Sequence, residues 1–311
     1  MTGAVPMHHP LALFAPPVAI ASTVHLRLPD ALRLQGRRSA WAQLQRPGHD
    51  THSFLEGPTF DAAGRLYLVD IAHGRILRVE RDDTVEVVAQ YDGEPNGLAL
   101  HPDGRLFVAD YRLGILVLDP GSGRLETFLD RDGMDRLKGP NDLLFSRDGE
   151  LYFTDQGSTG WQDPTGRVYR LGHDGRLDRL LENAPSPNGL ALTPDEGTLM
   201  VAVTRANALW RVPLRPRGGR ISKVGTFVQL SGGIGPDGLA MHADGRLAVA
   251  HFGLGCAWVF SALGVPLACV QSCAGLGVTN VAWGGEDGHT LYMTESETGT
   301  VLQARVPPLP G

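Results

Sequence analysis

Short apolar runs recur along the chain, and each follows a turn that contains a glycine. Six of them occupy equivalent places in a repeat, at residues 66–69, 106–109, 151–154, 199–202, 247–250 and 291–294. The turn glycines are residues 64, 104, 149, 197, 245 and 288, which gives spacings of 40 to 48 residues. Glycine and proline interrupt the sequence too often for helices of ten or more residues. Repeats of this length built from short strands are typical of β-propeller blades.

The second repeat shows how one blade is assembled. Residues 98–100, 105–109, 115–118 and 125–129 are predicted strands, and the turns between them contain proline or glycine. Four antiparallel strands in about 40 residues form one blade. Six such blades account for residues 52 to 306, so the sequence predicts an all-β, six-bladed propeller around a central channel.

The beginning of the chain lies outside the repeat. Residues 23–28 alternate in a way that suits the missing outer strand of the last blade, which would tie the two ends of the ring together. We therefore expect a flexible N-terminal tail at residues 1–22 and a single propeller domain at residues 23–311.

An acidic or amide residue stands eight or nine positions before each turn glycine. This polar column consists of Glu56, Asn96, Asn141, Asn188, Asp237 and Asn280. Each member begins an inner strand, so the fold would gather six oxygen-bearing side chains at one end of the channel, where a metal site is expected. Carboxylate and amide oxygens suit Ca²⁺. The sequence thus predicts one divalent cation, with calcium preferred and zinc, manganese, magnesium or iron as alternatives.

Asn-Gly and Asp-Gly are also common turn dipeptides, which offers a simpler explanation of the column. However, the first hairpin turn of each blade already lies at the later glycine. Three members of the column are followed by residues that make poor turn pairs: Glu56-Gly57, Asn141-Asp142 and Asn280-Val281. A ring of ligands is therefore the favoured interpretation.

A second column follows six residues after each turn glycine, where the second strand returns to the same end of the channel. It consists of Asp70, Asp110, Asp155, Val203, His251 and Thr294. Its aspartates would either orient the ring residues or cap the turns that follow them. His251 is a candidate proton carrier, with a purely structural role as the alternative.

Charge and composition narrow the class of protein. The net charge of −6 argues against nucleic-acid binding, and no apolar run reaches the 18 or so residues of a membrane span. The cysteines Cys256, Cys269 and Cys273 form neither a zinc motif nor a disulfide framework. Reduced, inert thiols suit a cytoplasmic protein. Phosphate-loop, dinucleotide and serine-hydrolase motifs are absent from the sequence.

Four segments of the polar column resemble one known family. These are Glu56-Gly57-Pro58, Pro140-Asn141-Asp142, Pro187-Asn188-Gly189-Leu190 and Pro236-Asp237-Gly238-Leu239, and they are similar to the signature of the SMP-30/gluconolactonase/luciferin-regenerating-enzyme family. The resemblance covers nearly the whole chain from about residue 50. It implies a six-bladed propeller with one catalytic divalent cation, and a lactone hydrolase. It also implies that Glu56, Asn188 and Asp237 hold the metal, that Asn141 is a fourth ligand or a substrate contact, and that Asp237 is the catalytic acid/base.

The chain departs from the family pattern at one position. Sugar-lactonase members often carry an arginine two residues before the asparagine that matches Asn141, and here that residue is Gly139, beside Lys138. An aldonolactone substrate therefore does not follow from the resemblance. The loop 157–166 and nearby residues are expected to shape the pocket instead, and the predicted substrate contacts are Asn96, Asn141, Trp161, Arg205 and His251.

The sequence thus predicts a metal-dependent hydrolase that opens the ring of a small lactone. A divalent cation would polarise the carbonyl and Asp237 would activate water. The alternatives are a phosphotriester or fluorophosphate hydrolase that uses the same site, and a non-catalytic binding propeller, against which the 7% aromatic content argues. A metal-free condensing enzyme is disfavoured by Glu56 and Asp237. No nucleic-acid or membrane partner is expected, and the chain is expected to be a monomer or a weak homo-oligomer.

Overall fold

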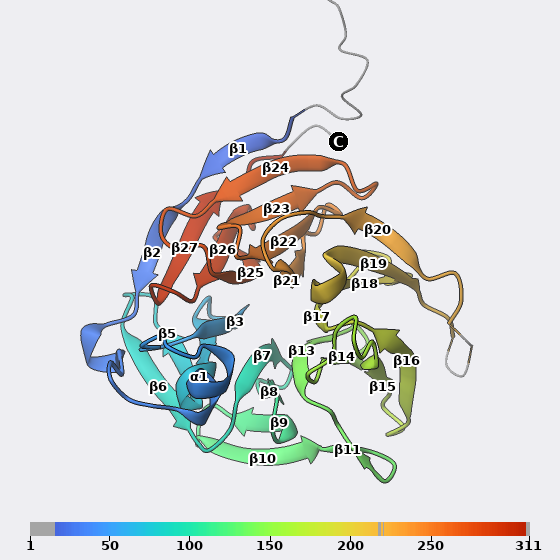
Figure 1. Cartoon of the computed structure of the whole chain (residues 1–311), viewed down its shortest axis with the longest axis horizontal. Helices are drawn as coiled ribbons and strands as arrows, with labels where there is room; N and C mark the ends of the chain where they lie inside the picture. The colour runs from blue at the N-terminus through green and yellow to red at the C-terminus, as the bar shows by residue number, and fades with distance from the viewer. Residues whose placement is uncertain (1–15, 217–218, 220, 309–311) are drawn as a thin grey trace, which may run out of the picture.

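The apolar runs of the sequence form the second strands of six sheets that surround a central channel (Figure 1). The computed structural model describes residues 16–216, 219 and 221–308. The prediction of a six-bladed β-propeller is confirmed. The assignment of the second repeat is also confirmed, except that its first strand begins three residues earlier, at Pro95.

The blades follow one another along the chain. Blade 1 contains β3 (Leu55–Phe60), β4 (Leu66–Asp70), β5 (Arg75–Val79) and β6 (Val85–Gln90), and blade 2 contains β7 (Pro95–Leu100), β8 (Leu106–Asp110), β9 (Gly114–Asp119) and β10 (Arg124–Leu129). Blade 3 contains β13 (Pro140–Phe145), β14 (Leu151–Asp155), β15 (Gly166–Leu171) and β16 (Leu177–Ala184), and blade 4 contains β17 (Pro187–Leu192), β18 (Thr198–Val203), β19 (Ala208–Pro213) and β20 (Gly225–Gln229). A small hairpin of β11 (Arg131–Asp132) and β12 (Asp135–Arg136) precedes blade 3.

The last two blades include strands from the beginning of the chain. Blade 5 contains β21 (Gly235–Met241), β22 (Leu247–Phe252), β23 (Cys256–Phe260) and β24 (Pro266–Gln271), and blade 6 contains β25 (Val278–Gly284), β26 (Thr290–Glu295) and β27 (Thr300–Arg305). β2 (Thr23–Arg27) pairs antiparallel with β27 as the outer strand of blade 6, as predicted.

The expected flexible tail at residues 1–22 is wrong in its last part. Val18–Ala21 forms β1, which pairs in parallel with β24 and so adds a fifth strand to blade 5. β24 would otherwise be the edge strand of blade 5 with unpaired backbone groups. β1 forms hydrogen bonds with these groups before the chain continues to β2 in blade 6. Residues 1–15 lie outside the described residues.

Burial is deepest in the second strand of each blade, because neighbouring blades cover both of its faces. All five residues of β4, β8 and β14 are buried, whereas the outer strands β6 and β10 contain no buried residue. Full burial of one large apolar side chain stabilises a fold by roughly 1.5–3 kcal/mol. Apolar clusters join adjacent blades, as where Val69 of β4 packs in one cluster with Leu98 of β7.

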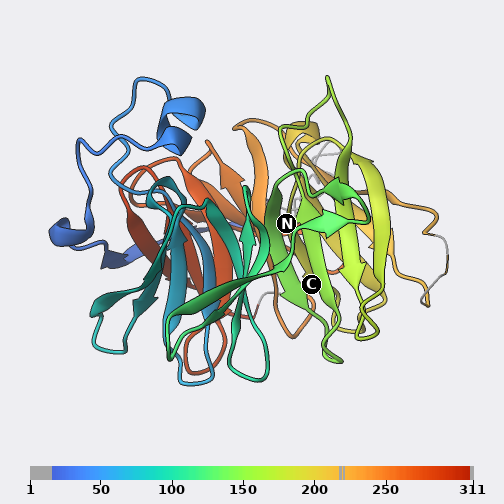
Figure 2. The ribbon, with the colours of Figure 1, turned by 90° about the horizontal axis from the view of Figure 1, so that it is seen from below.

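Within the described residues, helical structure is confined to short segments. A 3₁₀ turn (Asp30–Leu32) and helix α1 (Ala40–Gln45) precede blade 1, and 3₁₀ turns follow β4 (Ile71–His73) and β18 (Thr204–Ala206). The segment with α1 lies over one end of the strands (Figure 2). Within the part of the chain that the structure describes, no helix is long and apolar enough to cross a membrane.

Candidate active site

A cavity of about 690 Å³ opens at the end of the channel where the inner strands begin. Five of the six residues of the polar column line it: Glu56, Asn96, Asn141, Asn188 and Asp237. Trp161 and Arg205, both predicted as substrate contacts, line the same cavity. The sixth member of the column, Asn280, lines a different cavity.

The inner strands deliver these side chains through irregular pairing. In blades 1 to 5 the register of the inner strand shifts at the polar column, for example between Pro140 and Leu143 and between Pro236 and Leu239. A bulge adds a residue to one strand and re-aims the side chains around it. In those blades the residue before the column member pairs with the second column, as Pro236 does with His251, whereas in blade 6 the shift comes earlier and Asn280 itself pairs with Thr294. This difference explains why Asn280 leaves the ring that the sequence predicts.

Glu56 is held with one oxygen committed and one available. Its Oε2 accepts hydrogen bonds from Gly57 N at 2.6 Å and from Asn280 Nδ2 at 2.8 Å. The carboxyl is 3% exposed, and burial together with the nearby charge of Asp237 raises its pKa well above the usual range. A carboxyl whose pKa is raised by burial and by a neighbouring carboxylate stands in a site that lacks positive charge.

Asp237 lies beside Asn188, which bonds to the Asp237 carboxyl. Burial, with a contribution from the charge of Asp142, raises the pKa of Asp237 to about 8, and the exposed guanidinium of Arg205 acts in the opposite direction. A carboxyl with a raised pKa is a stronger base than one at the surface, which is what proton transfer near neutral pH needs.

Asn141 is oriented by a chain of amide contacts. Its Nδ2 donates to Gln156 Oε1 at 3.1 Å, and Gln156 Nε2 donates to Ser186 Oγ at 3.0 Å. Because these bonds occupy the nitrogen of Asn141, its Oδ1 is the atom available to a ligand in the cavity.

The aspartates of the second column anchor the segments that lead into the ring. Each accepts a hydrogen bond from the backbone nitrogen two residues before a ring residue: Asp70 from Phe54 at 2.8 Å, Asp110 from Glu94 at 2.8 Å and Asp155 from Gly139 at 2.7 Å. Asp110 also accepts from Arg112 N and Leu113 N and so caps the following turn. Turn capping, one of the two roles that the sequence left open, is thus seen at Asp110, and the other bonds fix the backbone that leads into the ring.

Residues 54–297 match the family described as SMP-30/Gluconolactonase/LRE-like region. The chain belongs to this family. Lactonase drp35 of Staphylococcus aureus (strain USA300) is 29% identical over 268 residues, which cover 83% of this chain and 77% of that protein.

Two solved structures show the shared fold of this SMP-30/gluconolactonase-family chain. A gluconolactonase from Xanthomonas campestris has a TM-score of 0.72 and 24% sequence identity, with 96% of this chain and 99% of that chain covered. A calcium-binding protein, regucalcin, from Agrobacterium tumefaciens has a TM-score of 0.73 and 21% identity, with coverage of 95% and 99%.

The donors of the cavity fit a hard divalent cation. The ring offers two carboxylates and several amide oxygens, and hard cations take all-oxygen sets of this kind. Among the described residues, no three histidine, cysteine, aspartate or glutamate side chains gather into a metal site by themselves. Amide oxygens must therefore complete the set, and Asn141 and Asn188 stand in place to do so.

The structure places His251 outside this family's candidate site. The side chain is fully buried, its Nε2 bonds to Gly232 O at 2.9 Å, and its Nδ1 accepts from Trp258 Nε1 at 3.1 Å. Burial lowers the pKa of His251. Both ring nitrogens are occupied inside blade 5, so the predicted substrate contact is not supported, and the structural alternative fits His251 better.

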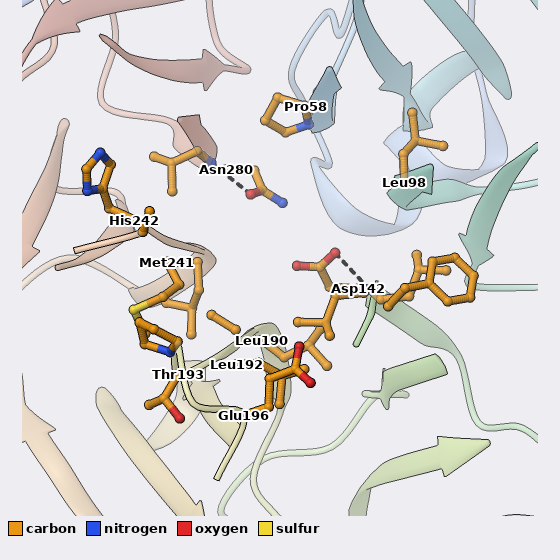
Figure 3. A pocket seen from close by; sticks show the side chains of 18 of the residues that line it. Pro58, Leu98, Asp142, Leu190, Leu192, Thr193, Glu196, Met241, His242 and Asn280 are labelled. Carbon is orange, nitrogen blue, oxygen red and sulfur yellow. Dashed lines mark hydrogen bonds between the residues drawn. The ribbon is translucent and has the colours of Figure 1, made fainter. Parts of the chain in front are cut away.

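A second cavity, of about 410 Å³, opens at the opposite end of the channel (Figure 3). Asp142 and Asn280 project into it among apolar side chains such as Leu190 and Met241. The Asn280 amide donates to Glu56 at 2.8 Å and also interacts with the Asp142 carboxyl, so it links a lining residue of one cavity to a lining residue of the other. Burial raises the pKa of Asp142 to about 7.

Sequence reasoning missed several residues of the first cavity, although a signal for them exists. The residue directly after the second column lines the cavity in five blades: Ile71, Tyr111, Gln156, Thr204 and Phe252. This third column lies where the second strand ends at the channel mouth, so the same period that reveals the ring also locates it. Trp41 and Gln45, which come from α1, carry no repeat signal.

Proposed function

We propose that this chain is a metal-dependent hydrolase that opens the ring of a lactone. The observation that carries the proposal is the pair of carboxylates, buried Glu56 and half-buried Asp237, that line one cavity together with the amides Asn141 and Asn188. The name of the staphylococcal relative, a lactonase, supports the same reaction class.

Glu56, Asn188 and Asp237 would hold the cation, with Asn141 as a fourth ligand or a substrate contact. A divalent cation bound there supplies a Lewis acid for the ester carbonyl and positive charge for the oxyanion that develops on it. Calcium is the preferred candidate, because every donor is an oxygen and a structural relative is described as a calcium-binding protein.

Asp237 acts as the general base and then as the general acid. Its carboxylate takes a proton from water while the water oxygen bonds to the acyl carbon. When the bond between the acyl carbon and the ring oxygen breaks, the same proton passes to the leaving alkoxide. The product is one hydroxy acid, and Asp237 returns to its starting state.

Asn280 and Gly57 position Glu56 for this chemistry. Both donate to Oε2, which fixes the carboxyl and directs Oε1 to a ligand. Partners of this kind around metal ligands affect metal affinity by about 10- to 100-fold. Arg205 and Trp161, at the open side of the cavity, are proposed to contact the substrate, as is Asn96.

The test measures the hydrolysis of five- and six-membered lactones by pH-stat titration of the acid that is released. The protein is stripped with EDTA and assayed before and after addition of Ca²⁺, Mn²⁺, Zn²⁺, Mg²⁺ or Fe²⁺. We expect turnover to vanish on stripping and to return with one of these metals. Absence of lactone hydrolysis by metal-loaded protein would overturn the proposal, and turnover of phosphotriesters in its place would establish the alternative hydrolase.

A further inference from the structure

The walls of the active-site cavity differ in chemistry from one side to the other. Trp41, Phe54, Ile71 and Phe252 line one side. The rings of Trp41 and Phe54 are 4.7 Å apart between centroids, and those of Phe54 and Phe252 are 6.3 Å apart. These four residues form a continuous surface, which we term the aromatic wall, in the cavity that Glu56 and Asp237 also line.

The aromatic wall is assembled from three parts of the chain. Phe54 leads into blade 1, Phe252 ends the second strand of blade 5, and Trp41 belongs to α1 (Figures 1 and 2). Ser39 caps α1 through Ala42 N at 3.1 Å, and Arg33 binds the segment to blade 6 through Leu28 O and Thr298 O at 2.8 and 2.7 Å. Trp41 is therefore held in place by the fold.

Residue 139, where the family resemblance led us to expect an arginine, leaves no room for a side chain. A Cβ atom added to Gly139 would lie 2.6 Å from Cε2 of Tyr111, and the φ of Gly139 is +150°, which side chains rarely adopt. Tyr111 thus occupies the space into which an arginine at residue 139 would extend. A hydroxyl-rich substrate would lose the bidentate donors that a guanidinium provides.

Exposed apolar side chains also favour this end of the molecule. Leu44 of α1 is exposed at the cavity end, as are the loop residues Trp161, Ile234, Leu254 and Leu276, whereas Leu263 is exposed in a turn at the opposite end. Exposed apolar side chains gathered around an opening are characteristic of ligand-binding surfaces.

We infer that the substrate is a lactone that carries an apolar substituent, alkyl or aryl, and few hydroxyl groups. This inference rests on the proposed function. The lactone carbonyl would face the carboxylates and amides at the base of the cavity, while the substituent packs against the aromatic wall. Each methylene of the substituent that becomes buried should raise kcat/KM by about fourfold, from the usual free energy of methylene burial.

The test compares three six-membered lactones on the metal-loaded full chain: δ-valerolactone, its pentyl-substituted analogue δ-decalactone, and glucono-δ-lactone. We expect δ-decalactone to have the highest kcat/KM, by at least about tenfold over δ-valerolactone. Trp41→Ala and Phe252→Ala should lower kcat/KM for δ-decalactone and leave δ-valerolactone within about twofold. Phe128→Ala, which removes an exposed ring on the outer strand β10, is the matched control and should change neither.

Two results would overturn the inference while the proposed function stands. The first is that glucono-δ-lactone has the same kcat/KM as δ-decalactone. The second is that Trp41→Ala lowers kcat/KM equally for δ-valerolactone and δ-decalactone. If no lactone reacts at all, the proposed function fails and the wall is tested separately. Calorimetric binding of 2-pentylcyclopentanone, but not of cyclopentanone, that is weakened by Trp41→Ala would still establish the apolar subsite, and its absence would refute it.

Discussion

The two ends of the central channel are built from the same six inner strands, yet they differ in chemistry. At the candidate active site the strands present Glu56, Asn96, Asn141, Asn188 and Asp237. The next residue along each strand is Gly57, Gly97, Asp142, Gly189 or Gly238, and the opposite cavity is bounded mainly by apolar side chains. A one-residue step along a bulged strand thus separates an oxygen-rich site from an apolar one.

This comparison shows that a buried carboxyl does not by itself define an active site. Asp142 is buried and Asp237 is half-buried, and loss of contact with water raises the pKa of both carboxyls. Asp237 stands among further oxygen donors in the larger cavity, whereas Asp142 is bonded to Leu143 N at 2.9 Å and to Asn280. The surroundings thus distinguish the carboxyl that we propose to be reactive from a structural one.

The largest expected effect tests that distinction directly. Asp237→Asn should lower kcat for lactone hydrolysis by about 10²- to 10⁴-fold, because the amide cannot accept the proton from water. Asp142→Asn, the matched variant at the other end, should stay within about tenfold of the original rate because it transfers no proton to substrate. The measurement is kcat from steady-state kinetics of both variants. An equal loss of kcat in the two variants would contradict the proposal that only the carboxyl at the candidate active site takes part in the reaction.

The second prediction concerns Asn280, the residue that links the ends. Asn280→Ala removes the donor to Glu56 Oε2 and should weaken Ca²⁺ binding by about 10- to 100-fold, as measured by calorimetry. Asn96→Ala should leave the affinity within about twofold, since Asn96 is proposed to contact substrate rather than metal. Unchanged affinity in the Asn280 variant would mean that Glu56 needs no support from the opposite end.

The third prediction tests the close packing at the middle of the channel. A Cβ atom on Gly238 would lie only 1.9 Å from Asn280 Oδ1. We expect Gly238→Ala to reduce the free energy of unfolding by about 1–3 kcal/mol in urea denaturation. Gly121→Ala is the control, because its Cβ would come no nearer than 3.3 Å, to Asp119 Oδ1, and it should have little effect. Equal stability of the two variants would contradict the described packing.

The smallest effect is a pH dependence at the active-site end, where His251 precedes Phe252 in β22. Its folded pKa is lowered, so the unfolded chain binds a proton more readily, and stability is lost as pH falls below about 6.5. Protonation at Nδ1 would also oppose the donor Trp258 Nε1. His251→Gln should therefore lose less stability than the parent between pH 7.5 and 5.5, in urea titrations with EDTA present. A parallel loss in both proteins would exclude His251 as a source of acid sensitivity.

The repeat made much of this molecule predictable. A period of 40 to 48 residues with a turn glycine gives the blade, and the polar column gives five of the side chains that meet in one cavity. The same pattern gave a wrong prediction for Asn280. The repeat predicts which residues are equivalent in the blades, but it does not predict the residue at which a strand bulges. One residue of difference in the bulge of blade 6 sends that side chain toward the other end.

Features outside the repeat were not predictable. β1 pairs in parallel with β24, although residues 18–21 share no pattern with any blade. Trp41 reaches the cavity from a six-residue helix whose position depends on distant contacts, such as that of Arg33 with Thr298 O. Tyr111 fills the space beside Gly139, and the separation of these two residues in the sequence does not predict their contact.

The pairing of β2 with β27 also sets an order of events during synthesis. Thr23 leaves the ribosome long before its partner Gln303, yet the two must lie side by side in the finished ring (Figure 1). Blades 1 to 4 contain only strands that are consecutive in the chain and can pair as they emerge, whereas the outer strand of blade 6 must wait until β27 has been synthesised. Contacts so distant in sequence form slowly, and unpaired strand edges invite aggregation in the meantime. A nascent chain that stalls before residue 300 would therefore display β2 without its partner, as an open edge for quality-control factors to recognise.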